Sequence, residues 1–181
     1  MIEFNYCPQC AKPLSEAERG GRVRKVCEPC GFVRYQNPTV GVAVVLMRGG
    51  RILLGRRAKG CSYEGKWCIP CGHVEWDEDI RVAGVREFEE ETGLQVELGK
   101  VVAVHSNFHN PDQHTVGVWF SATEVGGALK PGDDIGEVRF FELPSDDEMA
   151  FPTDLLVLEQ LRSQVDSTQN QPNALPESET R

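Results

Sequence analysis

The chain has 181 residues, 40% of them hydrophobic, which is enough for one α/β domain with a core of its own and a small accessory module. Its formal net charge of −9 disfavours binding to nucleic acid or to an anionic membrane, because both partners need cationic protein surface. No apolar run approaches the roughly 18–20 residues that span a bilayer, and the first residues lack the build of a secretory signal. We therefore expect a soluble, cytoplasmic protein that has no membrane partner.

The N-terminal segment, residues 1–36, contains two pairs of cysteines in CxxC spacing, Cys7 with Cys10 and Cys27 with Cys30. Two such pairs are typical of a zinc ribbon, in which four thiolates surround one tetrahedral ion. A segment this short has too little core to fold alone, so the zinc would supply much of its stability. A redox role for the two pairs is the alternative.

The next residues, 35–38, predict a linker, because Asn-Pro favours a turn. Two β-rich segments follow at 39–47 and 51–57, and the two glycines between them predict a hairpin. A short apolar piece at 66–72 ends in proline and glycine. A helix then runs to Thr92, with Asp77 or Asp79 as its N-cap and Gly93 as its C-terminal stop.

The second half of the chain predicts three more strands, at 95–106, 115–125 and 136–143, and an amphipathic helix at 153–164. Strands on both sides of a central helix, closed by a second helix, indicate an α/β domain over residues 37–165 with a mixed sheet between helical layers. Residues 166–181 are polar and contain few apolar side chains, which predicts a disordered tail.

The central helix carries an unusual density of glutamates near its C-terminal end. Glu87, Glu90 and Glu91 stand three and four residues apart, so they share one face and repel one another by roughly 0.2–0.5 kcal/mol per pair. Hard divalent cations take oxygen ligands and would make such a cluster favourable. Arg86 could hold one of these carboxylates in a fixed rotamer. A solvated charged face is the alternative interpretation.

The pattern around these glutamates resembles the signature of the Nudix hydrolase family. Gly72, five residues, Glu78, seven residues and then Arg86-Glu87-Phe88-x-Glu90-Glu91-x-Gly93-Leu94 match that signature without a gap. The lead-in "GKWCIPCGHVEWDE" is similar to the family's, although Cys71 and Asp77 stand where the family commonly has glycine.

The resemblance implies the Nudix α/β/α sandwich and metal-dependent hydrolysis of a pyrophosphate bond in a nucleoside diphosphate linked to another group. It implies that Glu87, Glu90 and Glu91 bind Mg²⁺ or Mn²⁺, with the Gly72 carbonyl as a further ligand, and that Arg86 orients a carboxylate. The general base varies within the family. We expect either a helix carboxylate or Glu137, which stands in "DDIGEVRFF" (133–141).

A zinc ribbon directly before a Nudix domain resembles NADH pyrophosphatases and a group of FAD or ADP-ribose pyrophosphatases. The segment 105–115 keeps little of the NADH-type motif, whereas 30–46 is more like the FAD/ADP-ribose group. FAD or ADP-ribose is therefore the expected substrate. NADH, nucleoside triphosphates and a ligand-sensing role remain the alternatives, and a homodimer stays open.

Several other residues have two interpretations each. Arg56, Arg57 and Lys59 could reach substrate phosphates or could be ordinary surface charge. Tyr35, Tyr63 or Phe108 could stack on a base or serve as packing groups. Cys61, Cys68 and Cys71 are interpreted as buried small residues, with a second metal or redox site at Cys68 and Cys71 as the alternative.

Overall fold

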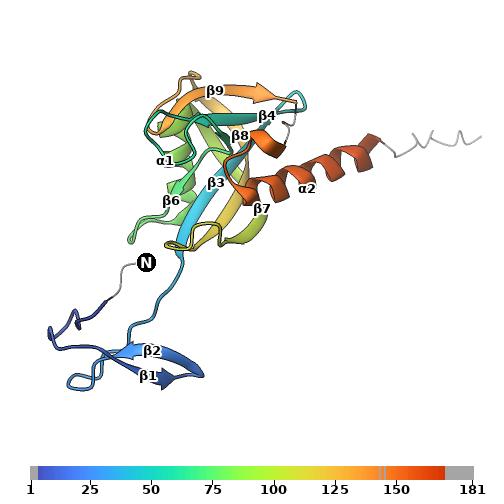
Figure 1. The fold of residues 1–181 in the computed structure, drawn as a ribbon. Coiled ribbons are helices and arrows are strands. Elements are labelled where there is room, and N and C mark those ends of the chain that lie inside the picture. Colours follow the sequence, from blue (N-terminus) through green and yellow to red (C-terminus); the bar gives the residue numbers. More distant parts are fainter. Residues whose placement is uncertain (1–3, 143, 145, 170–181) are drawn as a thin grey trace, which may run out of the picture.

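A computed structural model describes residues 4–142, 144 and 146–169, with the side chains of 164–169 left aside. The N-terminal segment is an antiparallel hairpin of β1 (Ser15–Arg19) and β2 (Arg22–Val26), with the four cysteines in the turns that flank it. Gly20 and Gly21 both have positive φ, as a tight two-residue hairpin turn requires. Figure 1 shows this ribbon standing apart from the rest of the molecule, joined to it by one extended stretch of chain.

The body is built on a mixed sheet, as predicted. Its strand order is β5-β4-β3-β8-β7, with β6 paired to β3 and β9 paired to β4. The β3–β8 pair is parallel, and the other pairs are antiparallel. The strands are β3 (Thr39–Arg48), β4 (Arg51–Arg57), β5 (Trp67–Cys68), β6 (Cys71–His73), β7 (Leu94–Asn107), β8 (Thr115–Gly127) and β9 (Ile135–Phe141).

Two helices cover the sheet, α1 (Ile80–Thr92) on one face and α2 (Pro152–Gln169) on the other (Figure 1). The alternation of β3 separates two cores. Val44 and Leu46 pack with Phe88 of α1, whereas Ala43 and Val45 belong to the cluster that contains residues of α2. This confirms the α/β/α arrangement.

The ends of α1 follow the predicted signals. Asp79 is the N-cap, and its carboxylate accepts a hydrogen bond of 2.8 Å from the amide of Arg81. Gly93 adopts the left-handed conformation at φ 71° and donates its amide to Glu89.

The C-terminal helix is longer than predicted. α2 continues to Gln169, through the first residues of the segment expected as a tail, and residues 170–181 lie outside the described part of the chain. Within the described residues, neither helix is long and apolar enough to cross a membrane.

Candidate active site

The three glutamates of α1 occupy very different environments, although they share one face of the helix. Glu91 is buried at 1% exposure, the side chain of Glu87 is 15% exposed, and that of Glu90 is 52% exposed. The acidic face therefore runs from the interior to solvent. A ligand held along it would touch buried and exposed carboxylates at once.

Glu91 is hydrogen-bonded to β6, the strand that precedes α1 in the chain. Its Oε2 accepts a hydrogen bond of 2.8 Å from the amide of Cys71. Burial raises the pKa of Glu91 well above its usual range, and electrostatic interaction with Cys71 and Asp134 raises it further. A nearby cation would reverse this effect, because it favours the ionised carboxylate.

Arg86 connects the acidic residues to one another. Its guanidinium donates two bonds of 2.8 Å to the carboxylate of Glu78. It also pairs with Glu87 at 2.9 Å and with Glu90 at 3.1 Å. The sequence predicted one such carboxylate. The fork geometry of the guanidinium lets it hold three, and Glu78 serves to anchor it.

Gly72 lies directly against Glu87. A Cβ atom added to Gly72 would stand 1.9 Å from the carboxyl carbon of Glu87, closer than any real contact. Only glycine therefore permits this approach of the β6 backbone to the helix carboxylate. The two motif positions, fifteen residues apart in the chain, meet in the fold.

The structure does not bring Glu137 to the helix carboxylates. Glu137 pairs with Arg56 at 3.0 Å, while its neighbours Val138 and Phe140 pack in the core beneath α1. Side chains alternate along a strand, so Glu137 faces away from α1. Its role as the base stays a prediction.

Asp134 is a residue that sequence reasoning missed. The residues just before Asp134 run alongside the C-terminal end of α1. The amides of Lys130 and Gly132 donate hydrogen bonds to the carbonyls of Thr92 and Glu91. This places Asp134 near enough to raise the pKa of Glu91. Nothing in "DDIGEVRFF" separates Asp134 from Glu137 as a candidate, because only the loop path decides which carboxylate reaches the site.

Asp134 has a partner on one oxygen only. Its Oδ2 pairs with Arg57 at 2.6 Å, and its Oδ1 is buried without a hydrogen-bond partner among the described residues. An orphaned buried carboxylate oxygen is unusual and indicates a position for a water molecule, an ion or a ligand. Arg57, predicted as either phosphate contact or surface charge, is 11% exposed and so is not ordinary surface charge.

An aromatic cluster lies beside Arg57. Tyr63 contacts both His109 and Phe151 edge-on, and His109 stacks on Phe151 with ring centroids 5.8 Å apart. The guanidinium of Arg57 lies 6.0 Å from the Phe151 ring. Tyr63 keeps 43% of its surface exposed, whereas Nδ1 of His109 is buried without a partner among the described residues. Three loops far apart in the sequence supply these rings, so the sequence could not show that they lie together.

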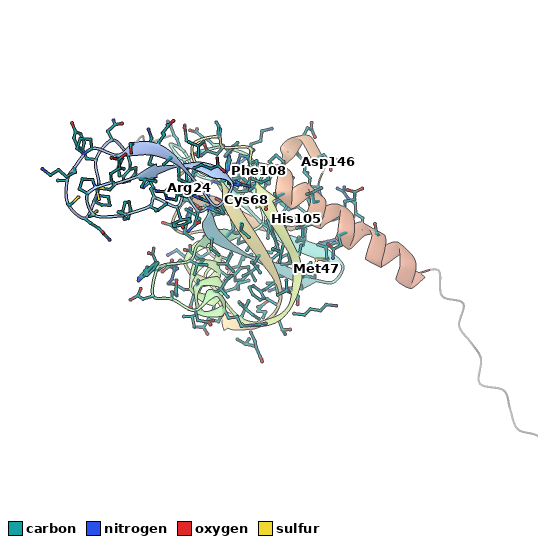
Figure 2. All side chains as sticks on the ribbon, turned by 90° about the horizontal axis from the view of Figure 1, so that it is seen from below. Arg24, Met47, Cys68, His105, Phe108 and Asp146 are labelled. Atoms are coloured by element: carbon teal, nitrogen blue, oxygen red, sulfur yellow. The ribbon has the colours of Figure 1, made fainter. Side chains whose placement is uncertain are left out.

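The remaining cysteines fit the prediction of buried small residues in part. Cys68, labelled in Figure 2, is fully buried, while Cys61 and Cys71 are half-buried. The hydrogen bond with Cys68 and burial raise the pKa of the Cys71 thiol well above its usual value. Protonated thiols pack as small hydrophobic groups and are poor nucleophiles.

The four N-terminal cysteines form a compact cluster. Their sulfur atoms approach to 3.4 Å between Cys10 and Cys27, 3.5 Å between Cys10 and Cys30, and 3.6 Å between Cys7 and Cys30. A tetrahedral zinc with bonds of about 2.3 Å would separate its sulfurs by about 3.8 Å. Across the described residues, this is the one group of three or more metal-binding side chains whose ligand atoms all lie within 4.8 Å of one another.

Comparison with known proteins agrees with this geometry. The family model of the NUDIX domain matches residues 36–158. The chain is 33% identical over 129 residues to the ADP-ribose pyrophosphatase of Methanocaldococcus jannaschii, covering 71% of this chain and 76% of that protein. It is 34% identical over 103 residues to the CTP pyrophosphohydrolase of Escherichia coli, covering 46% and 76%.

A solved structure of a NUDIX hydrolase from Nitrosomonas europaea is similar over nearly the whole length, with a TM-score of 0.76, 29% identity and coverage of 93% of this chain and 95% of that one. Fold, motif and relatives agree, so the chain belongs to the Nudix hydrolase family and is a pyrophosphohydrolase.

Proposed function

We propose that the protein hydrolyses the pyrophosphate bond of ADP-ribose, or of another ADP-linked diphosphate such as FAD, to AMP and a second phosphate. The observation that carries the proposal is the acidic face of α1, on which buried Glu91 is hydrogen-bonded to β6, the strand that contains Gly72. The similarity to a relative named ADP-ribose pyrophosphatase supports ADP-ribose as the first choice.

The donor types of the acidic face suit a divalent metal ion. Glu87, Glu90 and Glu91, with the carbonyl of Gly72, are the oxygen donors that Mg²⁺ or Mn²⁺ takes. Burial of Glu91 beside Asp134 is costly for an ionised carboxylate without a cation, which supports this assignment. When bound, such an ion would neutralise charge on the diphosphate and lower the pKa of a coordinated water molecule. Arg86 and Glu78 keep the carboxylates in place.

A helix carboxylate stays a candidate for the general base, and two carboxylates outside the helix, Asp134 and Glu137, are the others. Asp134 is supported by its orphaned oxygen and its electrostatic contact with Glu91, and Glu137 by the sequence pattern alone. The matched variants Asp134→Asn and Glu137→Gln separate them. If Asp134 is the base, we expect its variant to lose roughly 10²–10⁴-fold in kcat while Glu137→Gln loses little.

The cluster of Tyr63, His109 and Phe151 offers a place for the base of the nucleotide. An exposed aromatic ring can stack on adenine, and Arg57 next to it carries positive charge suited to a phosphate. Tyr63→Leu should raise KM several-fold with kcat nearly unchanged, whereas a purely structural ring would alter stability instead.

For the N-terminal segment, we propose structural zinc held by its four cysteines. The sulfur spacing is close to that of a tetrahedral four-thiolate site, and the ribbon has little core besides. The metal content of the purified protein, with one zinc per chain expected, tests this directly.

The deciding experiment is a hydrolysis panel with Mg²⁺ and Mn²⁺ over ADP-ribose, FAD, NADH, dinucleoside polyphosphates and nucleoside triphosphates, with the products identified by mass. We expect AMP to be released fastest from ADP-ribose or FAD. Efficient cleavage of CTP or another triphosphate to the monophosphate and pyrophosphate would instead favour the activity named for the Escherichia coli relative. Binding of a nucleotide without turnover would favour a sensor.

A matched pair of variants ties the activity to the proposed site. Glu91→Gln keeps an acceptor for the Cys71 amide but removes the charge, and we expect turnover to fall by orders of magnitude. Glu89→Gln lies on the same helix but bonds to Gln95 at 2.9 Å in solvent, so its turnover should stay near that of the unmodified protein. Equal activity of the two variants would contradict the assignment.

A further inference from the structure

The hairpin of the ribbon separates its charges between its two faces. Paired residues of an antiparallel hairpin point to the same side, and successive residues alternate. The register pairs Arg19 with Arg22 and Ala17 with Arg24, which puts all three arginines on one face. Glu16 and Glu18 lie on the other face, opposite Lys25 and Val23.

Tyr35 completes this surface. The guanidinium of Arg24, labelled in Figure 2, lies over the Tyr35 ring at 4.6 Å from its centroid. Tyr35 is nevertheless 62% exposed, so most of the ring is open to solvent. We call Arg19, Arg22, Arg24 and Tyr35 the arginine face.

The charges of the arginine face are not neutralised within the described residues, where no carboxylate lies within ion-pair distance of its three guanidinium groups. Arg19 and Arg24 donate instead to the carbonyls of Glu18 and Arg19. Lys25 on the opposite face, by contrast, pairs with Glu16 at 3.1 Å.

The net charge of the ribbon is opposite in sign to that of the whole chain. Residues 1–36 contain six lysines and arginines against four glutamates, a net charge of +2, while the whole chain carries −9. The remaining 145 residues therefore carry −11. The expectation that nucleic acid would be repelled follows from the body, and it does not apply to a ribbon that stands apart from it (Figure 1).

We propose that the arginine face binds single-stranded nucleic acid. Guanidinium groups pair with phosphates in a bidentate manner. Arg22 and Arg24 stand two residues, or about 7 Å, apart on β2, and Arg19 lies opposite Arg22 across the hairpin. The open Tyr35 ring supplies a stacking surface for an unpaired base, which a base inside a duplex could not reach. A second copy of the acidic body would meet the same positive charge, and the oligomeric state tests that alternative.

This binding is independent of hydrolysis, since none of these residues belongs to the proposed active site. Arg22→Gln and Tyr35→Leu should therefore leave the hydrolysis of a small nucleotide substrate unchanged. The two proposals can fail separately.

The test is fluorescence anisotropy of a labelled oligouridine of about 20 nucleotides with the full-length, zinc-loaded protein. Three phosphate contacts predict a slope of about −2 for log affinity against log salt, or a loss of about 20-fold between about 50 and 200 mM potassium chloride. Arg22→Gln should reduce that loss to about 7-fold, and Tyr35→Leu should weaken binding by roughly 5- to 100-fold.

Lys25→Gln is the matched control, because it removes one positive charge from the opposite face of the same hairpin. It should change neither the slope nor the affinity beyond about twofold. Zinc content, measured for each variant, establishes that the ribbon is folded. Absence of saturable binding, or equal effects of Lys25→Gln and Arg22→Gln, would overturn the proposal. So would a change of oligomeric state on mutation of the arginine face, which would assign the face to a contact between copies.

Discussion

Asp154 links α2 to the loop before Gly72 and to β8, and the effect of its protonation on the free energy of unfolding can be predicted from its burial. The side chain is 2% exposed and comes from α2. Its Oδ2 accepts the amide of Ile69, in the loop that leads to Gly72, at 3.0 Å, and its Oδ1 accepts Nε1 of Trp119 at 3.1 Å. Burial raises the pKa of Asp154 to about 7, against an ordinary value of 3.8, because two hydrogen bonds offset only part of the desolvation.

The sign and size of the effect on stability follow from this shift. Between pH 3.8 and about 7 the folded protein holds a proton that the unfolded chain has lost. The free energy of unfolding therefore falls as pH rises, by up to about 1.4 kcal/mol per pH unit and by about 4 kcal/mol in all. The contribution of Asp154 is fully present below pH 3.8 and is lost once the pH has risen through about 7.

Asp154→Asn removes this titration. The amide offers one acceptor to two donors, which costs about 1–3 kcal/mol at every pH. At pH 5 the free energy of unfolding of the unmodified protein should therefore be larger than that of the variant. Between pH 5 and pH 8 this difference should fall by about 2–3 kcal/mol.

The assay is urea unfolding followed by tryptophan fluorescence at intervals from pH 5 to pH 8. Other groups titrate in both proteins alike, so only the difference between the two curves reports on Asp154. Parallel curves would show that the carboxyl does not titrate in this window and would refute the reasoning from burial.

Three further predictions concern the site and the ribbon. Gly72→Ala should displace the Glu87 carboxylate, because the added Cβ would stand 1.9 Å from its carboxyl carbon. We expect kcat to fall by about 100-fold, while the free energy of unfolding changes by no more than about 1 kcal/mol. Gly136→Ala, whose nearest neighbour is at 3.5 Å, is the control, and equal activity of the two would contradict the geometry. Arg86→Lys should raise the Mg²⁺ concentration for half-maximal activity by about 10- to 100-fold, since an ammonium group cannot replace the bidentate contact with Glu78. An unchanged magnesium titration would contradict this role of Arg86. A zinc-selective chelator should unfold the ribbon, which NMR spectra can show, because the four cysteines would lose their ion. Hydrolysis by the body should stay intact once Mg²⁺ is restored, as an activity assay can show. A ribbon that is still folded after chelation would exclude structural zinc.

The features that depend on neighbours in the chain could be predicted from the sequence. Asp79 and Gly93 bound α1 through hydrogen bonds to residues two to four positions away. The shared face of Glu87, Glu90 and Glu91 follows from helical spacing alone, and the cysteine cluster follows from two CxxC turns.

The features that depend on contacts across the fold could be decided only by the tertiary structure. Helical spacing cannot tell that Glu91 is buried while Glu90 is exposed, because this depends on where β6 packs. The choice of Asp134 over Glu137 as the carboxylate near Glu91 depends on how the chain passes the end of α1. The burial and electrostatic environment of a side chain are set by residues that are distant in sequence. Identical glutamates of one motif therefore differ in exposure only after the sheet and its two helices have packed together.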